Sequence, residues 1–275
     1  MIPAPFTYQR AWSVDEALDL AARRSDEARF LAGGHSLLPL MKLRLSVPEV
    51  LVDIGQLDEL CYIREAGSEI VVGALTSYQE LAQSSMLHSE LPLLAQAAGQ
   101  VGDPQVRHRG TIGGSLAHAD PAADLPAVIM ALDATLVARG LSGTRQIGAG
   151  EFFRDMFESA LRPGELLTEI RIPKPKAAGW SYVKFTNRGI DWAIAGVAVQ
   201  GGRVALVNMG PRPLRAAAVE RALADGAAPR EAAAHAADGT SPPDDLHANR
   251  AYRKHLARVL VGRALEEASS RAAGP

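Results

Sequence analysis

The sequence has little cysteine and few aromatic residues, and it lacks a long apolar run. Its single cysteine, Cys61, excludes an internal disulfide and a cysteine-based metal or iron–sulfur site. No stretch reaches the ~18 uninterrupted apolar residues of a membrane-spanning helix. The first residues, MIPAPFTYQRAW, lack the basic and apolar regions of a signal peptide. We therefore expect no membrane span and a location in the reducing cytoplasm.

Neither sign of charge dominates the chain. Lys and Arg together number 29, and Asp and Glu together number 31, so the net charge is −2. This balance does not favour a nucleic acid or a charged membrane surface as a partner. The chain has 275 residues, of which 47% are hydrophobic. It is therefore long enough to bury the core of one large domain or two ordinary ones.

Common catalytic and nucleotide-binding motifs are missing as well. The sequence contains neither the P-loop G-x-x-x-x-G-K-[ST] nor the Rossmann G-x-G-x-x-G, and it contains no H-E-x-x-H or G-x-S-x-G. Its seven histidines are dispersed, and the pattern around His108 and His118 is more typical of hydrogen-bonding loop residues than of bases or ligands. We predict no metal ligands and no catalytic acid, base or nucleophile in this chain.

The sequence does contain a pair of similar Gly-Gly motifs. Ala32-Gly33-Gly34-His35-Ser36 and Thr111-Ile112-Gly113-Gly114-Ser115 each precede a helix-like run. Glycine permits positive φ angles and a close approach of backbone N–H groups to an anion, and a helix that starts after the turn adds unpaired N–H groups. One such motif is usually only a turn. Two motifs of the same form favour the two halves of a diphosphate cradle.

A diphosphate cradle without catalytic groups indicates a cofactor that brings its own chemistry. A flavin dinucleotide is the natural candidate, since it needs a carboxylate for its ribose hydroxyls and an apolar wall for its isoalloxazine ring. Asp124 and Trp192 are candidates for these two roles. Each also has a structural alternative, because Asp124 is a plausible helix N-cap and Trp192 a plausible core residue of a sheet.

The hydrophobic pattern predicts an α+β protein. Strands at Arg29–Ala32 and Val50–Ile54 flank a helix at about Leu37–Arg44, which implies a small parallel βαβ unit. From about residue 57 the order of strands and helices no longer repeats. The stretch Pro173–Gly179, with two prolines and no apolar residue larger than alanine, indicates a linker.

The C-terminal part predicts an antiparallel sheet followed by helices. Three strand patterns lie within residues 182–208, and Gly201-Gly202 suits a hairpin turn between the last two. Helices are expected at about Leu214–Ala224, Pro229–Ala237 and Asn249–Ala268. The segment Ala224–Pro243 is rich in Ala, Asp, Gly and Pro, so we expect it to pack loosely outside the core.

Along nearly its whole length the chain resembles the medium, FAD-binding subunit of molybdenum hydroxylases, the group of carbon monoxide dehydrogenase and xanthine dehydrogenase. Any one of the motifs that carry this resemblance is weak alone, but their order and spacing together are specific. They are the two Gly-Gly motifs, Ala119-Asp120-Pro121-Ala122-Ala123-Asp124, Leu161-Arg162-Pro163-Gly164-Glu165-Leu166-Leu167, and Lys184-Phe185 followed by Asp191-Trp192-Ala193.

The resemblance implies a fold and a set of cofactor-binding residues. The fold would be a two-part FAD-binding module of the vanillyl-alcohol-oxidase (PCMH) type at 1–176, with subdomains at about 1–56 and 57–176, and a smaller C-terminal domain at 177–275. By similarity, the Gly-Gly motifs would hold the diphosphate, Asp124 would bond the ribose or adenine side, and Leu167, Lys184 and Trp192 would lie near the flavin. The full expected set is Ala32, Gly33, Gly34, His35, Ser36, Leu37, Thr111, Gly113, Gly114, Ser115, Ala119, Asp124, Leu167, Lys184 and Trp192.

The resemblance also implies partners. The chain would be an oxidoreductase subunit that takes electrons from an iron–sulfur small subunit, itself supplied by a molybdopterin large subunit, and passes them through FAD to a quinone, NAD or oxygen. The expected assembly is a dimer of heterotrimers. The Gly-Gly-His setting of His35 is similar to sites of covalent attachment in more distant flavoproteins, but we expect non-covalent FAD. Ser115 stands where many relatives have Asp or Asn.

Two other functions remain open from the sequence. One is a free-standing FAD oxidase or reductase of the same fold, which would need an acid or base near the ring. The other is a phosphate-binding module without flavin, which leaves the Asp191-Trp192 match without a role.

Overall fold

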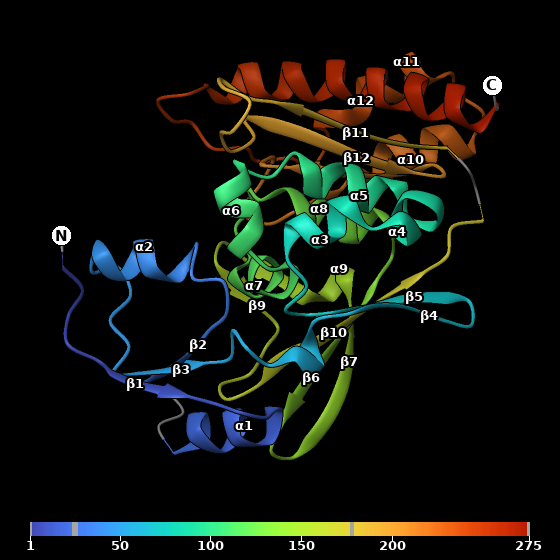
Figure 1. Cartoon of the computed structure of the whole chain (residues 1–275). Coiled ribbons are helices and arrows are strands. Elements are labelled where there is room, and N and C mark those ends of the chain that lie inside the picture. The colour runs from blue at the N-terminus through green and yellow to red at the C-terminus, as the bar shows by residue number, and fades with distance from the viewer. Residues whose placement is uncertain (1, 24–26, 177–178, 274–275) are drawn as a thin grey trace.

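The computed structural model describes residues 2–23, 27–176 and 179–273. It contains sheets of three, five and four strands and a small two-stranded hairpin. In Figure 1 a layer of helices separates the five-stranded sheet from the four-stranded one, and the three-stranded sheet lies at the N-terminal side. Residues 177–178 of the predicted linker lie outside the described residues.

The N-terminal sheet is parallel, as the βαβ pattern predicts. Its order is β1 (Thr7–Arg10), β3 (Val50–Asp53) and β2 (Ala28–Leu31), with α1 (Val14–Ala22) and α2 (Leu37–Lys42) in the connections. Helix α1 begins at Ser13, whose hydroxyl accepts from the Glu16 N–H. Its buried face closes a small core on β3. The first Gly-Gly motif therefore leaves a parallel sheet at the carboxyl end of β2, a position where such sheets bind ligands.

The middle sheet is antiparallel throughout, in the order β4-β5-β10-β6-β7. Its strands are β4 (Ile63–Ala66), β5 (Glu69–Gly73), β10 (Leu166–Pro173), β6 (Thr135–Gly140) and β7 (Gly143–Gly148). The register of β10 against β6 shifts between Leu167 and Glu169, which marks a bulge. The bulge lies beside the second Gly-Gly motif, because the helix that contains this motif packs on β10.

Short helices cover one face of this sheet. They are α3 (Tyr78–Gln83), α4 (Ser85–Glu90), α5 (Pro92–Gly99), α6 (Pro104–Arg109), α7 (Ile112–His118), α8 (Asp124–Ala131) and α9 (Ala149–Phe152). Helix α8 is buried along its whole length, since it contacts α5 on one side and the C-terminal sheet on the other. After α9 the hairpin of β8 (Phe153–Asp155) and β9 (Glu158–Ser159) returns to α7.

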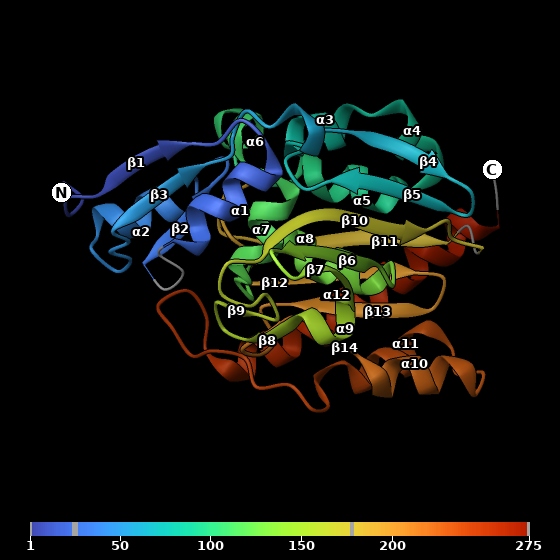
Figure 2. The same ribbon diagram turned by 90° about the horizontal axis from the view of Figure 1, so that it is seen from below.

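The C-terminal sheet has the order β11-β12-β13-β14 and is antiparallel. Its strands are β11 (Trp180–Phe185), β12 (Ala195–Gln200), β13 (Arg203–Val207) and β14 (Leu214–Arg215), followed by α10 (Ala217–Ala224), α11 (Pro229–Ala233) and α12 (Arg250–Ala272). Figure 2 shows β11, β12 and β13 side by side with α12 running along them. Strand β12 is buried on both faces because Ala198 packs toward the helical layer while Val197 and Val199 belong to the core with α12.

Several expectations about local structure are wrong, each for a tertiary reason. The helix predicted from Leu214 begins at Ala217, since residues 214–215 pair with β13. The segment Ala224–Pro243 is not loose, because Ala232, Ala233 and Ala236 are buried in the core with α12. Strands β1 and β7 were not predicted from the sequence, because they are edge strands with mostly polar, exposed side chains and little apolar alternation.

A buried charge pair joins the helical layer to the C-terminal sheet. Asp124 is 4% exposed, and it accepts hydrogen bonds from the Tyr182 hydroxyl and, at 3.1 Å, from the Lys184 ammonium of β11. Burial raises the pKa of Asp124, and the Lys184 charge and the Tyr182 hydroxyl oppose this rise because they favour the carboxylate. The N-cap of α8 is Ala123, so the N-cap interpretation of Asp124 is wrong.

Replacement of Lys184 by methionine should destabilise the chain in a pH-dependent way. The variant leaves the Asp124 carboxylate buried without a counter-charge, so we expect a loss of about 3–5 kcal/mol at neutral pH. The folded-state pKa of Asp124, already raised, rises further above its unfolded value of about 3.9, so stability falls as pH increases through the window between these two values. Urea unfolding at about pH 5 and about pH 8 should show the larger deficit at the higher pH.

The double variant Asp124→Asn/Lys184→Met provides the control, because it removes both charges. It should recover part of the lost stability and lose the pH dependence. Lys42→Met, at an exposed position, should have almost no effect. An equal, pH-independent deficit in the single and double variants would show that packing, and not charge, makes the contribution.

Candidate functional site

Two connected pockets lie where the N-terminal sheet, the helical layer and the C-terminal sheet meet. One, of about 280 Å³, opens between the first Gly-Gly loop and α7, and the other, of about 240 Å³, lies beside β11. Both are lined by a set of residues that we call the junction: His35, Ser36, Tyr78, Ser115 and His118. The two pockets therefore form one elongated site.

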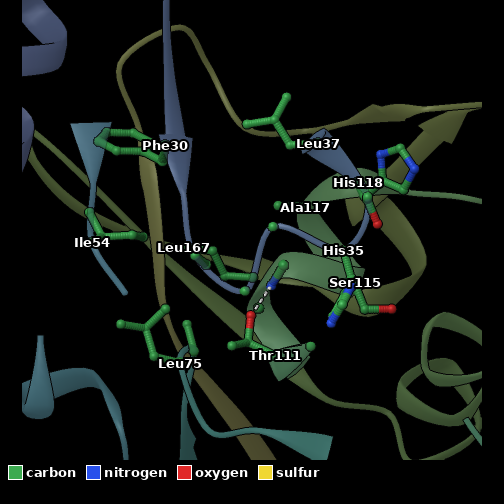
Figure 3. Close-up of a pocket in the computed structure, with 18 of the residues that line it drawn as sticks. Phe30, His35, Leu37, Ile54, Leu75, Thr111, Ser115, Ala117, His118 and Leu167 are labelled. Atoms are coloured by element: carbon green, nitrogen blue, oxygen red, sulfur yellow. Dashed lines mark hydrogen bonds between the residues drawn. The ribbon is translucent and has the colours of Figure 1, made fainter. Parts of the chain in front are cut away.

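The two ends of the site differ in chemistry. Beyond the junction, the first pocket has an apolar and mainly aliphatic wall, which we call the aliphatic compartment. It comprises one aromatic and six aliphatic residues: Phe30, Leu37, Ile54, Leu75, Leu161, Leu166 and Leu167. Figure 3 shows Phe30, Ile54 and Leu75 on one side of this pocket and His35, Ser115 and His118 on the other. The second pocket is lined by a tryptophan compartment that includes Asp124, Lys184, Ile190, Asp191 and Trp192.

The first Gly-Gly loop offers a series of free backbone donors. Gly34 has a φ of +77°, which turns the chain sharply between β2 and α2. In the part of the chain that the structure describes, the N–H groups from Gly33 to Leu37 have no intramolecular acceptor, and Ser36 makes no side-chain cap to α2. Successive unpaired N–H groups beside a helix start form a concave site that suits an anion.

The second Gly-Gly motif differs from the first. It is the first turn of α7, with Thr111 as the N-cap. The N–H groups of Ile112 and Gly113 donate to carbonyls in the segment after β5, at 3.0 and 2.8 Å. Those of Gly114 and Ser115 donate to the Thr111 hydroxyl, the dashed bond of 3.1 Å in Figure 3, and to the Thr111 carbonyl at 3.0 Å. The two motifs are thus not equivalent halves of a cradle, because the helix amides are already paired.

The glycines permit contact between backbones as well as an open site. A Cβ on Gly33 would lie 1.9 Å from the Arg109 carbonyl oxygen, and a Cβ on Gly113 would lie 2.6 Å from that of Ala74. Gly33 therefore lets the first loop touch the end of α6, and Gly113 lets α7 touch the segment that follows β5. A Cβ on Gly114 would meet only the Thr111 hydroxyl, at 2.8 Å, so this glycine leaves space at the pocket wall.

Leu167 lies in the aliphatic compartment, not beside Trp192. Both Leu166 and Leu167 line the first pocket, although adjacent strand residues normally face opposite sides. The alternation also holds here, since Leu166 belongs to the core of the N-terminal sheet and Leu167 to the core of the helical layer. Both residues nevertheless contribute to the wall of the first pocket.

The tryptophan compartment combines an exposed aromatic ring with buried charge. Trp192 is 59% exposed, so it is not the sheet-core residue of the structural alternative. The Lys184–Asp124 pair forms the buried floor of the same compartment. At the junction, burial raises the pKa of Tyr78 to about 12, and the Ser115 hydroxyl beside it partly opposes this shift. Tyr78 is therefore a neutral phenol at physiological pH.

The structure brings together all the sequence-predicted site residues except one. Ala119 is fully buried with a φ of 53° and serves as the left-handed C-cap of α7, outside both pockets. Sequence reasoning did not identify Phe30, Ile54, Leu75 and Tyr78, which carry no motif and reach the site only through packing. His118 was noted but assigned no role at the site.

Within residues 2–23, 27–176 and 179–273, no group of three His, Cys, Asp or Glu side chains is placed to hold a metal, and no helix combines the length and the apolar character that a membrane span requires.

Comparison with protein families agrees with this architecture. Residues 4–175 match the family described as "FAD binding domain in molybdopterin dehydrogenase", and residues 180–268 match the "CO dehydrogenase flavoprotein C-terminal domain". Among curated proteins, the carbon monoxide dehydrogenase medium chain of Hydrogenophaga pseudoflava is 42% identical over 99% of this chain and 100% of the relative. The glyceraldehyde dehydrogenase medium chain of Sulfolobus acidocaldarius is 35% identical over 97% of this chain and 99% of the relative.

Solved structures agree with the sequence comparison. Carbon monoxide dehydrogenase from Hydrogenophaga pseudoflava superposes with a TM-score of 0.95 at 43% identity, covering 99% of this chain and 100% of that chain. Quinoline 2-oxidoreductase from Pseudomonas putida 86 gives a TM-score of 0.92 at 31% identity, covering 99% of each chain. The expected fold, an α+β FAD-binding module followed by a smaller C-terminal region of antiparallel sheet and helices, is confirmed. The chain belongs to the family of FAD-binding medium subunits of molybdenum hydroxylases.

Proposed function

We propose that this chain holds FAD along the elongated site and carries electrons from an iron–sulfur partner to an external acceptor. The observation that carries the proposal is the run of unpaired N–H groups from Gly33 to Leu37, which lies between an aliphatic and an aromatic compartment. A dinucleotide has the matching order of parts, with a diphosphate between two ring systems. When bound, FAD supplies the electron-accepting and electron-donating chemistry.

The compartments support an assignment of the two ends of FAD. The adenosine fits the aliphatic compartment, and the isoalloxazine fits the tryptophan compartment, where the Trp192 ring is exposed and the Lys184 ammonium is paired with Asp124. Leu167 then belongs to the adenosine end, and Asp124 belongs to the flavin end through Lys184. Both assignments reverse the roles expected from the resemblance, because Asp124 lines the same compartment as Lys184 and Trp192, while Leu167 lines the other.

The residues of this chain bind and orient the cofactor, and none is assigned to acid–base catalysis. The Gly33–Leu37 amides would donate hydrogen bonds to the diphosphate, and the buried Lys184–Asp124 pair would form the floor of the flavin end. We propose that the FAD is non-covalent, with His35 as a loop residue beside the diphosphate. Flavin absorbance that stays with acid-precipitated protein would contradict this.

The relatives are named as medium chains, so large and small subunits are partners of chains of this type. We propose a dimer of heterotrimers with an iron–sulfur small subunit and a molybdopterin large subunit, in the cytoplasm. We propose domains at 1–176, with subdomains at about 1–56 and 57–176, and at 177–275. A quinone, NAD or oxygen is the proposed acceptor. The substrate is set by the large subunit.

Glycine substitutions should separate loop packing from cofactor binding. Gly33→Ala places a Cβ against the Arg109 carbonyl, so we expect a loss of about 1–3 kcal/mol in unfolding free energy together with loss of flavin. Gly114→Leu fills the pocket wall and disturbs only the Thr111 cap, so we expect loss of flavin with a stability change of about 1 kcal/mol or less. The measurements are the visible flavin absorbance after removal of excess FAD and urea unfolding.

Gly150→Ala is the matched control, because a Cβ there meets nothing and the residue lies outside both pockets. It should keep both flavin and stability. If Gly114→Leu bound FAD like the wild type, the pocket wall at α7 would not be part of the cofactor site. If the wild type stayed colourless even when co-expressed with its partner subunits, the proposed function itself would be wrong.

Substitutions at the two ends of the site should have different spectral effects. Trp192→Leu should change the absorbance bands and raise the fluorescence of bound flavin, because an aromatic ring beside the isoalloxazine is removed. Leu167→Ala should weaken FAD binding about tenfold without changing the spectrum, since it removes apolar contact from the adenosine end. Trp12→Leu, at an exposed tryptophan outside both pockets, should change neither. A spectral change in Leu167→Ala and none in Trp192→Leu would reverse the orientation of the cofactor.

A further inference from the structure

His118 differs from the other histidines of the chain in its surroundings. It is half-buried at the end of α7, whereas the other six are exposed. Its ring lines both pockets at the junction. In the part of the chain that the structure describes, neither ring nitrogen has a hydrogen-bond partner, although the exposed rings of His88, His235 and His247 each have one. A half-buried polar ring without a partner, at the wall of a pocket, indicates contact with a ligand.

The ring of Phe157 is in contact with this imidazole. Phe157 occupies the turn of the β8–β9 hairpin, and its ring centroid lies 5.0 Å from that of His118. The Phe157 N–H also donates to the carbonyl of Ala119, the residue after His118, at 3.1 Å. The hairpin is therefore attached to the end of α7 by a backbone hydrogen bond and by a ring contact.

The conformation of Phe157 is unfavourable for its residue type. Its φ is 58°, in the left-handed region that a bulky side chain rarely adopts, and the residue is 55% exposed. Neither backbone preference nor core packing explains a phenylalanine at this position. Its ring contact with His118 offers a reason, since unfavourable backbone geometry persists where a site requires it.

Resting on the proposed function, we propose that His118 is a further cofactor-binding residue, which hydrogen-bonds the chain that links the two ring systems of FAD. Phe157 is a positioning residue that fixes the orientation of the imidazole. A dinucleotide that occupies both compartments must pass its diphosphate and ribityl chain through the junction. Phosphate oxygens accept hydrogen bonds and ribityl hydroxyls both donate and accept, so both match an imidazole.

The charge state of His118 agrees with this role. Burial lowers its pKa, and the carboxylate of Asp120 partly opposes the shift. The imidazole is therefore neutral at physiological pH, with one nitrogen as donor and the other as acceptor. The Asp120 carboxylate accepts from the Ala122 N–H at 2.8 Å, and within the described residues no hydrogen bond joins it to the His118 ring.

The first experiment measures FAD affinity for three variants of His118 in the full chain, in whichever form, isolated or in complex with its partners, the wild type holds flavin. His118→Leu should weaken FAD binding by about tenfold or more, because a hydrogen bond to the cofactor is lost. His118→Asn and His118→Gln place an amide near the positions of Nδ1 and Nε2, respectively. Recovery of affinity in one of them supports the hydrogen bond and identifies the nitrogen that makes it.

The outcomes separate this inference from the proposed function. Wild-type affinity in His118→Leu, or an equal loss in all three variants, would overturn the hydrogen bond while leaving the flavin site intact. A wild type without flavin, alone and in the complex, would overturn both. Thermal unfolding of the FAD-free variants should stay close to that of the wild type, because within the described residues the ring loses its contact with Phe157 but no hydrogen bond.

The second experiment tests the positioning role of Phe157 with a variant that removes its ring and relieves its backbone strain. Phe157→Gly relieves the left-handed conformation, so the FAD-free protein should unfold at the wild-type temperature or above it. FAD affinity should nevertheless fall several-fold, because the imidazole loses the ring that holds it. Asp133→Gly, at a φ of 56° outside both pockets, is the matched control and should leave FAD affinity unchanged. Wild-type affinity in Phe157→Gly would overturn the positioning role.

Discussion

The site depends on a contact between two backbones. The first Gly-Gly loop approaches the end of α6 so closely that even a methyl group on Gly33 would overlap the Arg109 carbonyl. This contact brings the carboxyl end of a parallel sheet against the start of α7. The elongated pocket, the junction residues and the unpaired N–H groups of Gly33–Leu37 all lie beside this contact. A larger residue at Gly33 would push the first loop away from the end of α6 before it reached any ligand.

The two Gly-Gly motifs are alike in sequence but differ in the hydrogen bonding of their backbone N–H groups. The first leaves its amides unpaired and so can bind an anion, while the amides of the second are paired with Thr111 and with carbonyls of the segment after β5. An anion site binds more tightly when a rigid neighbouring element holds its unpaired donors in place before the ligand arrives. The fixed N-terminus of α7 provides that rigidity. At the other end of α7 the Ala119 carbonyl accepts from the Phe157 N–H, which holds the β8–β9 hairpin beside His118.

Much of the fold followed from local pattern. The βαβ unit, the hairpin at Gly201-Gly202 and the long C-terminal helix each had a strong periodicity or turn signal, and the structure contains all three. Strand β7 and the buried alanines of α11 were missed for a common reason. An edge strand has little apolar alternation, and an alanine-rich segment is buried only if a larger element covers it, as α12 does here. The bulge at Leu167 likewise has no local signal, because it arises from the pairing of β10 with β6.

The sequence by itself determined the kinds of group available at the site: two glycine motifs, an aspartate, a lysine and a tryptophan in the order typical of one family. It also determined that glycine stands at Gly33, Gly34 and Gly113, where the backbone turns sharply or approaches another backbone closely. Tertiary structure alone decided which amides stay free, because a backbone N–H is satisfied or not according to the carbonyls that distant segments bring to it. It also decided that Asp124 pairs with Lys184 and that Leu167 and Trp192 lie at opposite ends of the pocket. Distances between segments remote in the chain are set by packing, and no local pattern encodes them.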